Sequence, residues 1–137
     1  MVRRAPESAA EVEAALSYPY PTRNARLIAR ENRFVARCLL DGREVSAHVP
    51  NTGRMLELML PDNRVWLADL GDDPTRRFRY RLVAAELRSQ PVLVESARTN
   101  AIVASLLDVD GVPGLEGYRA LEREVRVGDS RIDLLLT

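Results

Sequence analysis

The sequence predicts a mainly β protein, α+β overall, in which a small barrel of short strands precedes a second, incomplete domain. Two observations predict the barrel. Apolar and polar residues alternate with a period of two through much of residues 26–87, as in half-buried strands. Turn-forming segments such as Asp41-Gly42 and Gly71-Asp72-Asp73-Pro74 separate these runs. The third observation is the strongly apolar segment 131–136, which indicates a strand that needs further elements to cover it.

Size and composition limit the class of protein. With 137 residues and 46% hydrophobic residues, the chain can bury one good core, or a small core plus part of another. No apolar run is long enough to span a bilayer, and no signal peptide is recognisable at the N-terminus. The single cysteine excludes an internal disulfide and favours a reducing compartment. We therefore expect a cytoplasmic protein without a membrane partner.

The formal net charge of zero hides an uneven distribution. Residues 23–88 hold 13 arginines and 9 acidic residues, for +4, whereas residues 89–137 hold 5 arginines and 8 acidic residues, for −3. The cationic segment indicates an anionic partner. All 20 basic residues are arginine, a composition typical of a GC-rich genome, so this chain alone cannot supply a lysine ammonium group.

The N-terminal residues 1–22 are predicted to be an extension and linker. Ser8 and Glu11 have the spacing of a capping box, which predicts a short helix over residues 8–16. The run Tyr18-Pro19-Tyr20-Pro21 then ends the helix, because each proline forces its predecessor toward extended geometry.

Two long strands are predicted to open the barrel. The first runs from Arg26 and places one set of residues inward: Phe34, Ala36, Cys38 and Leu40. Asp41-Gly42 predicts a two-residue hairpin, because both central positions of a type I′ turn need positive φ. The return strand then points Val45, Ala47 and Val49 inward.

A short helix over residues 54–60, a strand over 65–68 and a strand over 76–87 follow. Trp66 and Tyr80 are predicted to lie in the barrel core. On the last strand Phe78, Tyr80 and Leu82 share one face, and Arg77, Arg79 and Arg81 share the other. Like charges about 7 Å apart along a strand do not help folding. The arginines are either solvated or face an anion, and both interpretations stay open.

Short strands with a brief helix between hairpins fit an OB-fold over residues 23–89. The fifth strand would come either from splitting the first strand near Glu31-Asn32 or from Val92–Val94. Residues 90–137 form the second domain, with a helix over 100–107 and strands over 122–127 and 131–136 around a Gly128-Asp129 turn.

Several short motifs in this order resemble the sugar fermentation stimulation protein family, DNA-binding proteins with an N-terminal OB-fold and a C-terminal α/β PD-(D/E)XK-type nuclease domain. The resemblance covers about residues 25–137 and is carried by Ala25-Arg26-Leu27-Ile28, His48-Val49-Pro50-Asn51-Thr52-Gly53, Val65-Trp66, Arg77-Phe78, Arg123-Glu124-Val125-Arg126 and Ser130-Arg131-Ile132-Asp133. The chain departs from the family at Val94-Glu95-Ser96, where Val-Asn-Thr is usual. It also lacks the following Glu-Val-Lys strand, so we expect a truncated nuclease domain.

By this resemblance, Asp133 corresponds to a metal-binding carboxylate and Glu124 to an upstream acidic ligand of a nuclease centre. The family domain implies Mg²⁺, which lowers the pKa of the attacking water. The partner glutamate and the lysine have no counterpart, so we expect no cofactor and no nuclease activity in this chain. The alternative role of Asp133 is an ordinary carboxylate paired with Arg131 or Arg126.

The resemblance also places nucleic-acid binding in the OB domain. The predicted phosphate contacts are Arg30, Arg33, Arg37, Arg54, Arg77, Arg79 and Arg81. Backbone amides of Asn51-Thr52-Gly53 would bind a further phosphate, or this segment is a simple hairpin exit. His48 is predicted to be a surface strand residue, and Cys38 a core residue rather than a nucleophile.

The predicted function is sequence-tolerant, salt-sensitive binding of DNA, with RNA as the alternative nucleic acid. Two other functions stay open. The chain could be a subunit or fragment of a metal-dependent DNA or RNA nuclease that another polypeptide completes. It could also be an inactive remnant that binds a protein or an oligosaccharide. The apolar strand Ile132–Leu136 predicts self-association or a partner chain that covers it.

Overall fold

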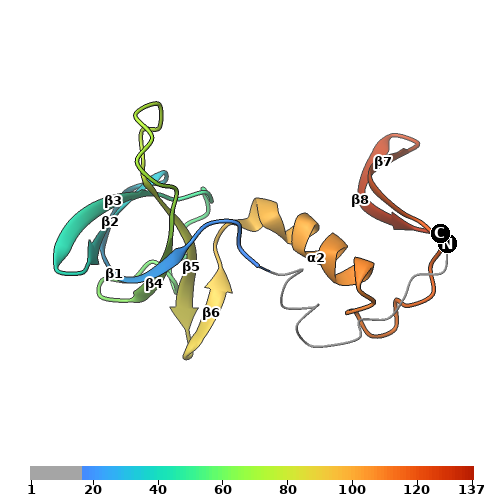
Figure 1. The fold of residues 1–137 in the computed structure, drawn as a ribbon, viewed down its shortest axis with the longest axis horizontal. Helices are drawn as coiled ribbons and strands as arrows, with labels where there is room; N and C mark the ends of the chain where they lie inside the picture. The colour runs from blue at the N-terminus through green and yellow to red at the C-terminus, as the bar shows by residue number, and fades with distance from the viewer. Residues whose placement is uncertain (1–16) are drawn as a thin grey trace. The chain divides into compact units, whose positions relative to one another are not determined.

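A computed structural model describes residues 17–137 as two compact units. One unit spans Tyr18–Ala97, and the other contains Arg98–Thr137 (Figure 1). The first unit extends further at both ends than the expected range 23–89. The helix expected over residues 8–16 lies outside the described residues.

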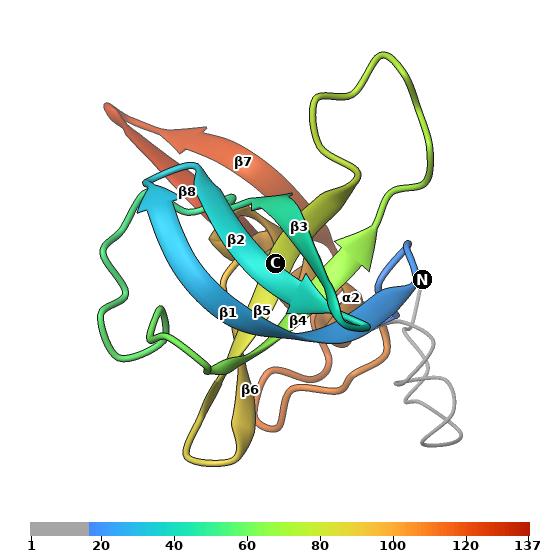
Figure 2. The ribbon, with the colours of Figure 1, turned by 90° about the vertical axis from the view of Figure 1, so that its left-hand side faces the viewer.

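The first unit is a closed five-stranded barrel with an OB-fold topology. Its strands are β1 (Thr22–Asn32), β2 (Val35–Leu40), β3 (Arg43–His48), β4 (Arg64–Asp69) and β5 (Tyr80–Leu87). The sheet order is β3-β2-β1-β4-β5-β6, with β6 (Gln90–Leu93) at the edge. A parallel pairing of β3 with β5, Ala47 with Tyr80 and His48 with Arg81, closes the barrel (Figure 2). The predicted fold class is confirmed.

The first predicted strand is two strands joined by a tight turn. The Asn32 side-chain oxygen accepts hydrogen bonds from the backbone N–H groups of Phe34 and Val35, at 2.8 and 3.0 Å. This Asx turn reverses the chain, so β1 and β2 pair antiparallel. Phe34 was predicted to point inward, but the turn leaves it half exposed. Both proposed sources of an additional strand are present, the split near Asn32 and β6.

The β2–β3 hairpin forms as predicted. Asp41 and Gly42 have φ of 50° and 75°, the geometry that a type I′ turn requires. Ala36, Cys38 and Leu40 of β2 are buried in the core with Ala47 of β3. Burial raises the pKa of the Cys38 thiol to about 12, so the thiol is inert, as expected for a core cysteine.

The helix predicted over residues 54–60 is wrong. Met55 has a φ of 46°, in the left-handed region, which is incompatible with a helical run through this residue. The segment instead forms a single turn, in which the N–H of Met59 donates to the carbonyl of Met55 at 2.9 Å. This turn places Leu58 in the barrel core.

Two predictions about β4 and β5 are also corrected. Val65 and Leu67 of β4 are fully buried, so Trp66 between them points to the outer face, where the Arg64 guanidinium lies 5.0 Å from its ring centroid. The last barrel strand begins at Tyr80 rather than Arg76. Tyr80 is buried as predicted, but Arg77, Phe78 and Arg79 belong to the preceding loop.

The second unit consists of α2 (Thr99–Asp108) and a hairpin of β7 (Leu121–Val127) and β8 (Ser130–Leu136). These elements match the helix and the two strands that the sequence predicts. The Tyr118 hydroxyl donates to the Leu107 carbonyl at 2.5 Å and ties the loop after α2 to the helix. Within residues 17–137, no helix has the length and apolar character needed to cross a membrane.

Candidate nucleic-acid interface

Two loops of the barrel each present an arginine beside a phenylalanine. The β1–β2 turn carries Arg33 and Phe34, with the Arg33 guanidinium 5.6 Å from the ring centroid. The β4–β5 loop carries Arg77 and Phe78, with the corresponding distance 5.3 Å. The corresponding loops of OB-folds, together with the face of the second and third strands, are where these domains bind oligonucleotides and oligosaccharides.

His48, the last residue of β3, connects the two loops. Its ring stacks on Phe78 with centroids 6.1 Å apart and planes inclined by 30°. His48 and Phe34 line a cavity of about 410 Å³, and His48, Arg77 and Phe78 line another of about 280 Å³. A third cavity of about 260 Å³ is lined by Arg33 and Arg54, and Thr52 lines both this cavity and the one of about 410 Å³. Each cavity thus shares a lining residue with the next, and we call the side chains along them the Arg–Phe track: Arg33, Phe34, His48, Thr52, Arg54, Arg77 and Phe78.

Barrel closure positions the track. The backbone N–H of Val49 donates to the carbonyl of Phe34 at 2.7 Å, which holds the β1–β2 turn against the end of β3. The N–H of Leu70 donates to the carbonyl of Arg79 at 2.8 Å and closes the base of the β4–β5 loop. In Figure 1 this loop, in yellow-green, extends beyond the barrel strands.

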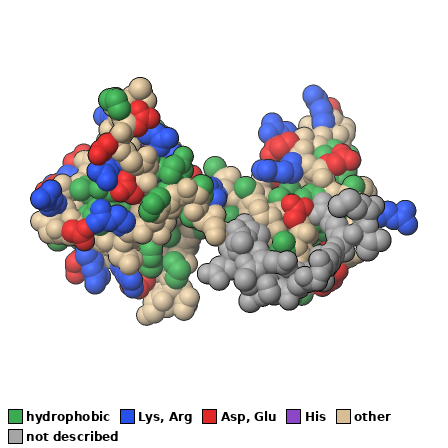
Figure 3. Space-filling model, viewed as in Figure 1, with side chains coloured by type: hydrophobic (Ala, Val, Ile, Leu, Met, Phe, Trp, Pro, Cys, Tyr) green, Lys and Arg blue, Asp and Glu red, His purple; other side chains and the backbone are tan. Residues whose placement is uncertain are grey.

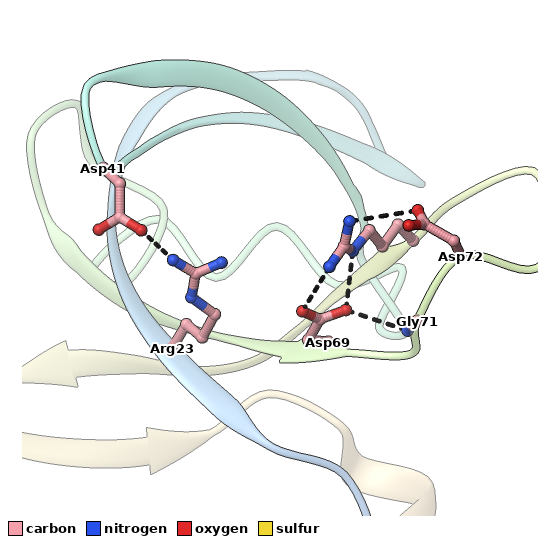
Figure 4. A network of polar contacts seen from close by, with 6 residues as sticks. Arg23, Asp41, Asp69, Gly71 and Asp72 are labelled. Atoms are coloured by element: carbon pink, nitrogen blue, oxygen red, sulfur yellow. Dashed lines mark hydrogen bonds and ion pairs between the residues drawn. The ribbon is translucent and has the colours of Figure 1, made fainter.

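Three of the seven predicted arginines are neutralised by acidic partners. Arg79 binds both oxygens of Asp69, at 2.9 and 3.0 Å, and also contacts Asp72 at 3.2 Å. Figure 4 shows the carboxylates of Asp69 and Asp72 turned toward this guanidinium. Arg81 pairs with Glu95 at 3.1 Å. Arg37 pairs with Glu31 and Glu44, at 3.0 and 2.6 Å.

The expected row of three arginines on one strand face is therefore wrong. Arg81 lies on β5, whereas Arg77 and Arg79 lie in the loop before it. The Arg79 hydrogen bonds lower the pKa of the Asp69 carboxyl, as does the backbone N–H of Gly71, which Asp69 also accepts. Arg79 thus serves to fix the base of the loop.

Arg30 is a structural residue. Its guanidinium donates to four backbone carbonyls, those of Asn51, Gly53, Arg54 and Arg33, at 2.8, 2.5, 3.0 and 2.8 Å. Burial lowers its pKa, but the group stays charged at neutral pH. Arg30 holds the segment after β3 against the β1–β2 turn through both terminal nitrogens, and only its buried Nε has no hydrogen-bond partner among the described residues.

Arg33, Arg54 and Arg77 are exposed, and none has an acidic partner within the described part of the chain. Elsewhere charges of both signs are interspersed over the face seen in Figure 3. The uncompensated positive charge along the track therefore comes from these three residues, with Arg33 and Arg54 at one end and Arg77 at the other.

The Asn51-Thr52-Gly53 segment is held by its own side chain. The Asn51 side-chain oxygen accepts the N–H of Gly53 at 2.9 Å, and its amide nitrogen donates to the carbonyl of Val94 at 3.1 Å. The Gly53 amide is therefore engaged within the turn. Thr52 is exposed and lines two of the three cavities.

A buried carboxylate lies beside the track. Glu95 is 8% exposed and accepts hydrogen bonds from the Tyr18 hydroxyl at 2.6 Å and from Arg81 at 3.1 Å. Burial lowers the pKa of the nearby His48, and the positive charge of Arg81 lowers it further, whereas Glu95 raises it. His48 is therefore uncharged at neutral pH.

The two candidate metal carboxylates do not form a metal site. Glu124 and Asp133 lie opposite one another on β7 and β8, between the pairs Arg123–Leu134 and Val125–Ile132. Arg131 pairs with Glu124, not with Asp133, and Arg126 contacts the carbonyl of Gly128. No group of three or more His, Cys, Asp or Glu side chains suited to a metal occurs within residues 17–137. Hard cations need more oxygen ligands than this pair offers, so these residues do not fit Mg²⁺.

Sequence reasoning missed Phe34, Phe78 and His48 as site residues. Alternation predicts Phe34 on an inward face and Phe78 on the strand face of Tyr80 and Leu82. The available signal was the repeated Arg-Phe dipeptide, each time just after turn-forming residues, Glu31-Asn32 and Asp72-Asp73-Pro74.

Comparisons with known proteins agree with this fold. A family model described as the SfsA N-terminal OB domain matches residues 28–94. A sugar fermentation stimulation protein homolog from Azorhizobium caulinodans is 43% identical over 126 residues, covering 88% of this chain and 53% of the relative. One from Clostridium novyi is 38% identical over 112 residues, covering 82% of this chain and 48% of the relative.

A solved structure, Pyrococcus furiosus SfsA in complex with Ca²⁺, matches with a TM-score of 0.66 at 28% identity. The match covers 88% of this chain and 51% of that chain. The chain thus spans about half the length of the relatives it matches.

Proposed function

This chain belongs to the sugar fermentation stimulation protein (SfsA) family, and from that premise we propose that its OB barrel binds nucleic acid through the Arg–Phe track. One observation carries the proposal. The two loops flanking the barrel face each present an arginine without an acidic partner, within the described part of the chain, beside a phenylalanine ring. Positive charge beside aromatic faces is the arrangement by which OB-folds bind nucleic-acid strands.

Arg33, Arg54 and Arg77 act as the phosphate contacts. A guanidinium group offers paired donors that match phosphate oxygens. Among residues 17–137 no carboxylate pairs with these three groups, so no ion pair there has to break before they bind phosphate. Contacts to phosphate carry no sequence information, so binding is tolerant of sequence. DNA is the proposed ligand, and RNA of the same strandedness presents the same phosphates.

The second unit does not cleave nucleic acid on its own in this proposal. Glu124 forms an ion pair with Arg131. Within the described residues, Asp133 belongs to no group of three or more side chains that could hold a metal ion. A divalent cation in full-length relatives, such as the Ca²⁺ named for the Pyrococcus furiosus protein, would need ligands beyond this pair. The cytoplasm stays the expected location.

The test is a titration of the chain into a fluorescent 30-mer across a salt series. Three phosphate contacts predict a slope of log K against log salt of about −3 for a duplex and about −2 for a single strand. Absence of binding at low salt contradicts the proposal. Mg²⁺ is then added, and the appearance of cut products would overturn the proposed inactivity of the second unit.

A further inference from the structure

The only two phenylalanines of the sequence both lie on the track, and neither is in the core. Phe34 is 50% exposed, and Phe78 is partly exposed in the β4–β5 loop. Burying these rings would stabilise the barrel, yet the Asx turn at Asn32 and the late start of β5 keep both outside it. Their position therefore calls for a ligand that uses aromatic faces.

We propose that the Arg–Phe track selects unpaired nucleic acid, with bases stacked on Phe34 and Phe78 while Arg33, Arg54 and Arg77 hold the phosphates. This inference rests on the proposed function and names its substrate class. His48 stacks on Phe78 and lines the same cavity as Phe34. In the proposed complex these three rings form a row of stacking surfaces for successive bases.

The aromatic surfaces of the track favour an unpaired strand over a duplex, which offers the three arginines only its phosphates. In a duplex, base faces are covered by their neighbours, and only base edges reach the grooves. Reading those edges takes a helix or a two-stranded ribbon that enters the major groove. The track is made of a tight turn, an irregular loop and the end of a strand.

The arginines assist stacking as well as phosphate binding. Arg33 and Arg77 each lie over the ring of the following phenylalanine, at 5.6 and 5.3 Å. A base can stack on the ring or on the guanidinium plane, since both surfaces are flat and polarisable. The pairs thus combine a stacking surface with a positive charge at each end of the row.

The experiment compares three fluorescent ligands with the full chain at one salt concentration: a 15-mer of thymidines, a 15-mer of abasic sites and a 15-base-pair duplex. The thymidine strand is expected to bind about tenfold more tightly than the abasic strand of equal charge, and also more tightly than the duplex. Equal affinity for the thymidine and abasic strands, or tighter binding of the duplex, overturns the inference but leaves phosphate binding intact. Binding of none of the three overturns both proposals.

Variants locate the stacking. F34L and F78L are each expected to lose about tenfold in affinity for the thymidine strand and little for the abasic strand. The matched control is W66L, which removes an aromatic ring that also lies beside an arginine but on the outer face of β4. A thermal melt verifies folding of each variant. Equal losses for F34L and W66L contradict the assignment, and the ligand comparison with the unmodified chain stands whether or not a variant folds.

Discussion

His48 and Phe78 come from different parts of the barrel, β3 and the β4–β5 loop, yet their rings stack with centroids 6.1 Å apart. The contact depends on the parallel pairing of β3 with β5, which sets His48 beside Arg81 and so brings the preceding loop over the end of β3. The closure that makes the fold a barrel thus also assembles the track. The β3–β5 pairing therefore determines both the barrel and the position of the His48–Phe78 contact.

Arginines on the track and an exposed arginine away from it should differ in their effect on binding. R33Q, R54Q and R77Q should each make the salt slope shallower by about 1 and weaken binding by about five- to tenfold at 100 mM salt, because one released counterion is lost. The control is R43Q, since Arg43 is exposed at the other end of β3, about 17 Å from His48. An equal loss in R43Q would show that net charge, not the track, governs affinity.

Arg30 should matter for stability rather than for contact with the ligand. R30Q removes donors from four backbone carbonyls, so the free energy of unfolding should fall by about 2 kcal/mol in urea denaturation. The salt slope of the folded variant should keep its wild-type value. A shallower slope with unchanged stability would place Arg30 among the phosphate contacts instead.

The pKa of His48 should respond to its charged neighbours in opposite directions. Arg81 lowers this pKa and Glu95 raises it, so R81Q should raise it and E95Q should lower it relative to wild type. Because the chain has one histidine, its imidazole resonance in a proton NMR titration reports the pKa without assignment. Shifts of the same sign in both variants would contradict the described arrangement of the three groups.

The depressed pKa of His48 also predicts a pH dependence of stability. As the pH falls below about 6.5, the unfolded state takes up a proton that folded His48 resists. The free energy of unfolding should therefore decrease on acidification from 7 toward the folded pKa, and H48Q should lack this component. Identical stability profiles of wild type and H48Q between pH 7 and 5 would be evidence against burial of the ring.

Asp69 should stabilise the protein above its unfolded pKa. Because hydrogen bonds from Arg79 and Gly71 lower its folded pKa, this contribution is complete above about pH 4 and is lost as the pH falls through the folded value. The stability difference between wild type and D69N should thus be constant near neutral pH and shrink in acid. Urea denaturation at several pH values measures this difference in the free energy of unfolding. If the difference did not change with pH, D69N would act through packing rather than through the charge of Asp69.

Local chemistry made most of the fold predictable. The positive φ at Asp41 and Gly42 is what that dipeptide favours, and the alternation of Ala36, Cys38 and Leu40 identifies their inward face. Alternation failed at Phe34, because a two-residue turn at Asn32 reverses the chain and changes the phase of the pattern. On β4 the buried neighbours Val65 and Leu67 take the inward face, which leaves Trp66 on the outer one. Periodicity alone cannot detect such a short interruption.

The site was predictable only in part, because partners distant in sequence decide which arginines are free. Arg77 and Arg79 are two residues apart, yet only Arg79 meets Asp69 across the base of the loop. Arg81 meets Glu95 for the same reason, since β5 runs past the segment that follows β6. Sequence spacing identifies the basic segment, and tertiary contacts determine which of its charges remain available.

The most direct test follows the imidazole resonance of His48 while a thymidine 15-mer is added to the chain. Because His48 lies at the centre of the track, its resonance should move and saturate with the same dissociation constant that fluorescence anisotropy gives. If the oligonucleotide binds while this resonance stays in place, nucleic acid contacts another surface and the track is not the binding site.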